Sequence, residues 1–150
     1  MKKNIILAIA SIGGIGFFPW ASGTVASAAT ILPYFWLRNN LSIYIVVTIL
    51  VIVIGVWISS RAEEILESKD PHAIVIDEVA GYLIAAIALP NHWFYPIAAF
   101  FIFRFFDVIK PMFINRLQSL PGGWGVMLDD VLAGIYTNII LQIVNYFYKF

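Results

Sequence analysis

The chain has 150 residues, of which 61% are hydrophobic and 12% charged, and its formal net charge is zero. A soluble domain of this length cannot bury so much apolar surface, so lipid must be the solvent for most of it. The neutral charge offers no electrostatic footprint for a nucleic-acid partner, and the absence of cysteine excludes disulfides and thiolate chemistry. We expect one integral membrane domain over residues 1–150.

The first 37 residues contain two apolar stretches. Residues 4–18 are interrupted by three glycines and ended by Pro19, whereas residues 22–37 are rich in small side chains that let helices pack closely in a membrane. The lysines at the start and a later small-residue run also resemble a secretory signal, but the glycine-rich interruption is untypical of one. We predict a helix over residues 22–37 and leave open whether residues 4–37 cross the membrane or re-enter it.

Four further apolar segments follow. Residues 41–58 carry no charge and approach the roughly 20 residues that cross about 30 Å of hydrocarbon. Residues 73–89 and 93–106 are separated by residues 90–92, a short polar break that predicts a helical hairpin. Residues 131–148 are uncharged and end in an aromatic belt. The sequence therefore predicts an all-α, polytopic membrane protein with four or five transmembrane or re-entrant helices.

The distribution of charge predicts which face is cytoplasmic. With five spans and the N-terminus inside, seven basic residues fall on the inner face and two on the outer face, as the positive-inside rule expects. The inner set is Lys2, Lys3, Arg61, Lys69, Arg104, Lys110 and Arg116, and the outer set is Arg38 and Lys149. All nine acidic residues also fall on or near the inner side. We predict a protein of a bacterial-type inner (cytoplasmic) membrane whose active site faces the cytoplasm.

Five carboxylates from three segments are expected at one membrane depth. They are Asp77, Glu78, Asp107, Asp129 and Asp130. A carboxylate at membrane depth costs several kcal/mol unless it is paired or binds a cation. Oxygen ligands without histidine or cysteine favour magnesium. Each cluster alone also fits the interfacial end of a helix or an ion-pair ladder, and it is the combination that favours a Mg²⁺ site.

Basic and small polar residues accompany these carboxylates and suit a phosphate substrate. Two cations flank the central carboxylate at helical spacing, a glycine-rich loop precedes the last acidic pair, and hydroxyls lie near the inner end of the first span. The same residues also fit ion pairing, a flexible turn and close helix packing, respectively. The candidate phosphate-binding residues are Thr24, Ser27, Arg104, Lys110 and Gly123.

Four sequence blocks, in this order along the chain, resemble the phosphatidylglycerophosphatase A family. They cover residues 22–27, 70–81, 103–111 and 122–134. The first block departs from the family in one place, because Ser22 stands where the family usually has proline before Gly-Thr. The resemblance implies magnesium-dependent hydrolysis of phosphatidylglycerol phosphate to phosphatidylglycerol and phosphate, a step of phospholipid biosynthesis with a lipid substrate in the bilayer.

Metal-assisted hydrolysis is the mechanism we expect. Asp77, Asp107, Asp129 and Asp130 are the candidate catalytic residues, and together with Glu78 they are the candidate metal ligands. The pattern leaves open which of them ligates and which acts as base or nucleophile. The alternative is a divalent-cation transporter or channel component, because intramembrane carboxylates also mark ion pathways. The oligomeric state is not predicted.

Overall fold

The structure, a computed structural model, describes residues 3–111 and 113–148. This part of the chain contains seven α-helices and one short 3₁₀ helix and no strand, which confirms the all-α prediction. In chain order they are α1 (Lys3–Ala10), η1 (Ile15–Phe17), α2 (Ser22–Leu37), α3 (Leu41–Leu66), α4 (Ile76–Ala86), α5 (Phe94–Ile109), α6 (Phe113–Gln118) and α7 (Gly123–Tyr148). Lys2 and Lys149, which contribute to the charge tally, lie outside the described residues.

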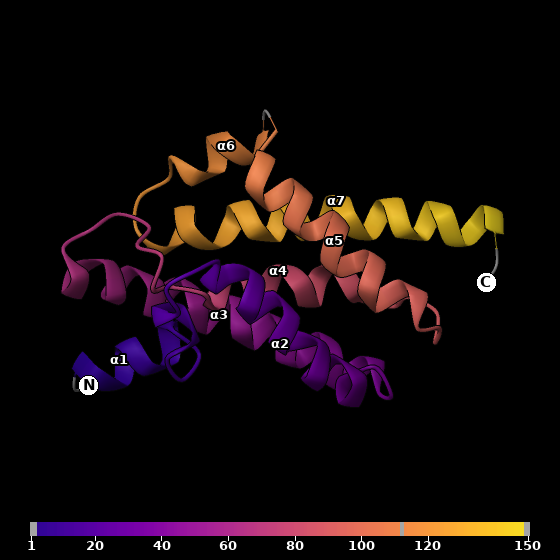
Figure 1. Ribbon diagram of the computed structural model, residues 1–150, viewed down its shortest axis with the longest axis horizontal. Coiled ribbons are helices and arrows are strands. Elements are labelled where there is room, and N and C mark those ends of the chain that lie inside the picture. Colours follow the sequence, from indigo (N-terminus) through magenta and orange to yellow (C-terminus); the bar gives the residue numbers. More distant parts are fainter. Residues whose placement is uncertain (1–2, 112, 149–150) are drawn as a thin grey trace.

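Two helices, α3 and α7, are long and apolar enough to cross a membrane, with 26 residues each. Both run along the long axis of the molecule, and α1 and the end of α7 lie at opposite ends of that axis (Figure 1). The outward face of α3 exposes apolar side chains such as Val46, Leu50 and Val53. A face of this kind is what a helix presents to lipid rather than to water.

The apolar stretch of residues 4–18 is divided into two short helices, α1 and η1. Gly13 and Gly14 take φ values of 69° and 105°, a backbone region that favours glycine, and α1 stops before them at eight residues. The carbonyl of Ala10 accepts a hydrogen bond from the backbone N–H of Val75 at 2.9 Å. Residues 4–18 therefore pack against the loop before α4 and form no helix long enough to span a bilayer. The next helix, α2, has the predicted bounds.

The predicted helical segment over residues 73–89 is too long, because α4 covers only Ile76–Ala86. It has only 11 residues, a length of about 16 Å, which is about half the thickness of the hydrocarbon core. Its first residue follows a loop, and beyond its end Ala88 takes a positive φ of 55° before Pro90. The predicted hairpin does form, because α4 packs against α5 across this turn.

Side chains from two other helices satisfy the end of α4. The hydroxyl of Tyr44 donates to the carbonyl of Leu83 at 2.6 Å. The side-chain amide of Asn138 donates to the carbonyls of Ala85 at 3.1 Å and Ile87 at 2.8 Å. The last carbonyls of a helix have no partner within the helix, and lipid supplies none. These bonds allow α4 to stop inside the protein.

Helix α4 lies at the centre of the bundle, in contact with α2, α3, α5 and α7. Its crossing with α7 is close, because a Cβ atom at Gly134 would overlap the carbonyl oxygen of Gly81. A Cβ atom at Gly81 would in turn lie 2.8 Å from the carbonyl oxygen of Asp130. Small residues at helix crossings permit this approach. The crossing brings the acidic first turn of α4 next to the acidic segment of α7.

Two further boundaries differ from the prediction. Helix α3 continues beyond residue 58 to Leu66, because residues 61–66 include strong helix formers, and it ends where Glu67 takes a φ of 51°. Helix α7 begins at Gly123, eight residues before the predicted segment. The glycine-rich stretch is therefore mostly the first turn of a helix and not a loop. Ser60 of α3 fixes that turn, since its Oγ accepts the N–H of Gly123 at 2.8 Å.

Candidate functional site

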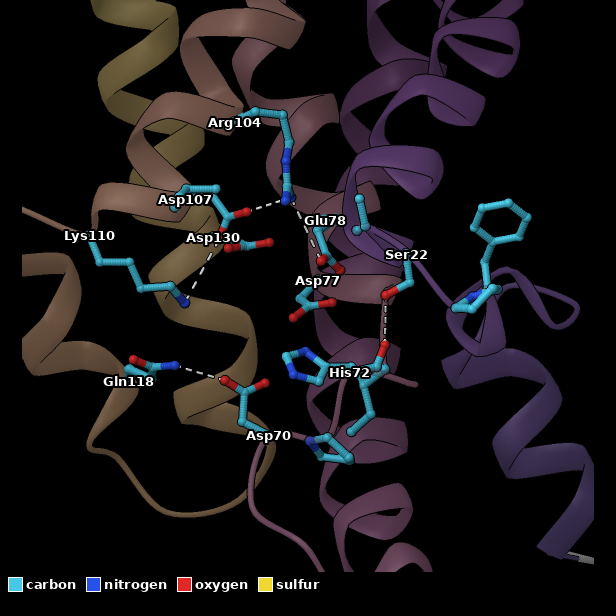
Figure 2. Close-up of a pocket in the computed structure, with 17 residues that line it drawn as sticks. Ser22, Asp70, His72, Asp77, Glu78, Arg104, Asp107, Lys110, Gln118 and Asp130 are labelled. Carbon is cyan, nitrogen blue, oxygen red and sulfur yellow. Dashed lines mark hydrogen bonds and ion pairs between the residues drawn. The ribbon is translucent and has the colours of Figure 1, made fainter.

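A cavity of about 490 Å³ lies where α2, α4, α5 and α7 come together. Its walls are the start of α2, the loop of residues 70–74, the first turn of α4 and the end of α5, and α6 and α7 contribute Gln118 and Asp130 (Figure 2). Asp77, Glu78, Arg104, Asp107 and Lys110 all border it, so the three acidic segments of the sequence do meet in one place.

Three carboxylates of this site lie close together. One oxygen atom each from Asp77, Glu78 and Asp130 lie within 4.8 Å of one another. One buried oxygen of each, Oδ1, Oε2 and Oδ2 respectively, accepts no hydrogen bond from any described residue. Buried polar atoms normally have a partner, and adjacent carboxylates repel each other. The group could therefore hold a metal ion, and its oxygen-only donor set suits a hard divalent cation.

The other two acidic residues form ion pairs. Arg104 Nη1 lies 2.5 Å from Asp107 Oδ2 and 3.8 Å from Glu78 Oε1. Lys110 Nζ lies 3.8 Å from Asp107 Oδ1 and also binds the carboxylate of Asp129 directly. Asp107 is thus held between two cations, and Asp129 anchors Lys110 from α7. Arg104 therefore contacts both Asp107 and Glu78, and Lys110 contacts both Asp107 and Asp129.

The backbone turns Lys110 towards α7. Lys110 follows the last residue of α5 with a φ of 46°, and its N–H donates to the carbonyl of Phe106 at 2.8 Å. A non-glycine residue in this left-handed region is uncommon. Pro111 follows directly and cannot extend the helix. Ala21 and Asp70, which also border the cavity, have positive φ values of 51° and 48°. Backbone strain of this kind concentrates at functional sites.

The carboxylates of Asp129, Asp130 and Asp107 also govern the charge of Lys110. Burial alone would lower the pKa of the Lys110 amine, but these carboxylates outweigh burial and hold the pKa above its ordinary value. Lys110 is therefore a permanent cation at neutral pH.

Gly23 in the first turn of α2 lets that helix approach the site. A Cβ atom at this position would overlap the carboxylate of Glu78 and lie 3.0 Å from Arg104 Nη1. The backbone of α2 therefore lies directly against the Arg104–Glu78 ion pair. The glycine of the first sequence block has this steric role, which its sequence context alone did not reveal.

Three candidate phosphate-binding residues do not border the cavity: Thr24, Ser27 and Gly123. The hydroxyl of Ser27 is buried and donates to the carbonyl of Gly23 at 2.7 Å within its own helix. The N–H of Gly123 is bound to Ser60, as described above. The packing role considered for the small residues of α2 accounts for Ser27.

Four residues with polar side chains that were not on the list of candidates also border the cavity: Ser22, Asp70, His72 and Gln118. Ser22 Oγ donates to the carbonyl of His72 at 2.9 Å, and Gln118 Nε2 donates to Asp70 Oδ2 at 2.8 Å (Figure 2). These bonds tie the loop before α4 to α2 and α6. Three of these residues lie in sequence blocks singled out above, whereas Gln118 had no signal in the sequence.

Comparison with known proteins adds to this geometry. The family model described as Phosphatidylglycerophosphatase A matches residues 8–145. A putative phosphatidylinositol-3-phosphatase of Bacteroides thetaiotaomicron is 36% identical over 142 residues, which covers 89% of this chain and 89% of that protein. The phosphatidylglycerophosphatases A of Haemophilus influenzae and Escherichia coli are each 36% identical over 137 residues, covering 89% of this chain and 84% and 79% of theirs. No solved structure matches the chain. The chain therefore belongs to the phosphatidylglycerophosphatase A family of phosphoric monoester hydrolases.

Proposed function

We propose that the chain removes the terminal phosphate of phosphatidylglycerol phosphate, with Mg²⁺ as cofactor, as a step of phospholipid biosynthesis. The observation that carries the proposal is the cavity itself. Three carboxylates, each with one buried oxygen that has no hydrogen-bond partner among the described residues, border the same space as Arg104 and Lys110. Cation-binding and phosphate-binding groups thus border one space. The family match and two of the named relatives support the glycerol phosphate headgroup.

Asp77, Glu78 and Asp130 are the ligands that we assign to Mg²⁺. Their oxygen atoms are close enough to share one ion, and the unpaired oxygens fit that role. When bound, the ion would polarise a phosphoryl oxygen and neutralise the charge that develops on it.

Arg104 and Lys110 would bind the remaining phosphoryl oxygens. Arg104 is held against Asp107, and its buried Nε donates no hydrogen bond to a described residue, so a donor is available. Lys110 keeps its charge because Asp129 and Asp107 surround it. Fixed cations beside a phosphoryl group stabilise the negative charge that builds up during its transfer. In this proposal Asp107 and Asp129 act by holding the two cations in position.

We further propose that α2, α3, α4, α5 and α7 cross or enter the bilayer in alternating directions, with the cavity on the cytoplasmic side of a bacterial inner membrane. The end of α3 and the start of α7 lie at the same end of the molecule (Figure 1). Arg61 in the last turns of α3, Lys69 after that helix and Arg116 on α6, which precedes α7, supply the positive charge that the positive-inside rule requires of a cytoplasmic face. The site is set back from it, because Asp129 and Asp130 lie two turns into α7.

The test is release of inorganic phosphate from phosphatidylglycerol phosphate by purified protein in detergent, with Mg²⁺ or with a chelator. We expect release with Mg²⁺ only, and a fall of several orders of magnitude in Asp130→Asn. Glu64→Gln is the matched control, because Glu64 is exposed and pairs with Arg61 on the surface of α3. The control should release phosphate at the wild-type rate.

A second substrate separates the two names found among the relatives. Phosphatidylinositol 3-phosphate carries the same phosphomonoester on a different alcohol, and we expect a lower kcat/KM for it than for phosphatidylglycerol phosphate. The reverse ratio would overturn the substrate that we propose. No release from either lipid, with folded protein and Mg²⁺ present, would overturn the phosphatase function and favour cation transport.

A further inference from the structure

The cavity has one polar wall and one apolar edge. On the polar wall, hydrogen bonds join Ser22 to His72 and Gln118 to Asp70 (Figure 2). The apolar edge consists of Phe18 and Pro19 before α2 and Val108 on α5, which all border the cavity and are all exposed at its rim. Phe18 is 53% and Val108 70% exposed. Exposed apolar side chains that gather beside an opening mark a site for an apolar partner.

The apolar edge continues along the outside of α5. Phe101, Phe105 and Val108 are spaced as i, i+4 and i+7, which places them on one face of the helix, and they are 65%, 57% and 70% exposed. Arg104 and Asp107, the neighbours of Phe105 and Val108 in sequence, turn inwards to the cavity. The same two turns of α5 therefore present cation and carboxylate on one side and a hydrophobic stripe on the other.

The part of the apolar edge that precedes α2 is also hydrophobic beyond the cavity. Phe17 and Trp20, beside Phe18 and Pro19, are 58% and 79% exposed. Tryptophan is favoured at the interface of a membrane, between headgroups and hydrocarbon. Both parts of the apolar edge, the segment before α2 and the end of α5, are thus suited to the level of the bilayer at which lipid phosphates lie.

We propose, building on the function above, that the opening between Phe18 and Val108 is a lateral entrance for the phosphomonoester lipid. The headgroup passes between these two side chains to reach Arg104 and the carboxylates, while the acyl chains stay in the bilayer against the stripe of Phe101, Phe105 and Val108. Withdrawing acyl chains into water would expose every CH₂ group that the bilayer otherwise buries. An apolar edge next to the cations avoids that exposure.

Photo-crosslinking tests where the lipid enters. A benzophenone amino acid replaces Val108, or as a control Val53, which is 63% exposed on the outward face of α3. Each protein is placed in phosphatidylcholine vesicles that contain labelled phosphatidylglycerol phosphate as a minor component, and is irradiated on ice. We expect position 108 to capture the labelled lipid several-fold above its share of the bilayer, and position 53 to capture lipids in proportion to their abundance. The proposal would be overturned if position 108 captured the labelled lipid only in proportion to its share of the bilayer. It would also be overturned if position 108 captured none of it while position 53 did.

Kinetics supply a second readout. Val108→Trp should narrow the opening and raise KM for phosphatidylglycerol phosphate in vesicles several-fold with little change in kcat, whereas Val53→Trp should change neither. An unchanged KM in Val108→Trp would contradict a role of this edge in lipid access. Failure of the proposed function looks different, because wild-type protein would then release no phosphate whatever the crosslinking pattern.

Discussion

Asp130 borders the cavity and lies beside the close crossing of α4 and α7. It is also one of the three carboxylates, with Asp77 and Glu78, that could share a metal ion. Without a cation, its charge repels those of Asp77 and Glu78. Asp130→Asn removes one charge at nearly constant size. We expect this variant to melt at or above the wild-type temperature in chelator, yet to gain less from Mg²⁺ than wild type, since a ligand stabilises the state that binds it. Thermal unfolding in detergent across Mg²⁺ concentrations measures both effects, and an undiminished gain from Mg²⁺ would remove Asp130 from the metal site.

Lys110 makes a different prediction, about alkaline pH. Burial would lower the pKa of its amine, but Asp129, Asp130 and Asp107 together raise it above the ordinary value of 10.5. A group whose pKa is higher in the folded state stabilises the fold below its unfolded pKa, and this contribution disappears as the pH rises through the folded value. The difference in melting temperature between wild type and Lys110→Met should therefore hold steady from neutral pH to 10.5 and shrink only above it. A difference that fades between neutral pH and mild alkali would show that Lys110 loses its proton there.

At the scale of elements, the crossing of α4 and α7 sets the distance between the carboxylates. Gly81→Ala would place a methyl group against the ring of Phe103 and 2.8 Å from the carbonyl oxygen of Asp130, so the helices must move apart. We expect a lower melting temperature and a loss of phosphate release of at least about tenfold, because small displacements of positioning groups cost that much. Gly55→Ala is the matched control, since its methyl group would meet only the flexible side chain of Met127. Equal effects of the two changes would argue against a geometric role of the crossing.

The end of α4 gives the second prediction for an element. Asn138→Leu keeps the size of the side chain and removes both hydrogen bonds to the carbonyls of Ala85 and Ile87. Leaving a buried carbonyl unpaired costs about 1–3 kcal/mol, and these two carbonyls are partly buried, so the unfolding free energy should fall by an amount in this range. Gln142→Leu removes one longer and exposed bond, 3.2 Å to the carbonyl of Ala88, and should cost less. Denaturant unfolding in detergent ranks the two, and the opposite order would contradict the capping role.

These elements also show how far the sequence predicts the fold. The bounds of α2 and the apolar centre of α3 were predicted because composition and local spacing determine them. The end of α4 was not, because it depends on hydrogen-bonding side chains far away in the chain, Tyr44 and Asn138. The first turn of α7 was mistaken for a loop for a similar reason, since its partner is Ser60.

The site follows the same rule. The sequence showed that carboxylates from three segments, together with Arg104 and Lys110, belong to one place, because charge at membrane depth is costly and must be shared. It could not separate the group of Asp77, Glu78 and Asp130 from the ion-pairing residues Asp107 and Asp129. That division depends on the left-handed turn at Lys110, which sends its amine to a carboxylate 19 residues further along the chain.

For the whole molecule, the orientation in the membrane can be tested because the chain has no cysteine. Single cysteines at Asn39, between α2 and α3, and at Asn91, between α4 and α5, should react with a membrane-impermeant maleimide added to spheroplasts. A cysteine at Ser68, after α3, should react only after the membrane is permeabilised. All three positions are exposed, so protection reports the side of the membrane and not burial.

The position at Asn91 carries most of the information. Helix α4 is too short to cross the hydrocarbon core by itself, and it reaches the outer face only if its buried first turn starts well inside the bilayer. Labelling of Asn91→Cys from outside would mean that α4 and its following turn complete the passage from a recessed cytoplasmic cavity. Protection of Asn91→Cys together with labelling of Asn39→Cys would instead make α4 and α5 a re-entrant hairpin. The reverse pattern, with Ser68→Cys labelled from outside, would place the carboxylates and their lipid substrate on the outer leaflet.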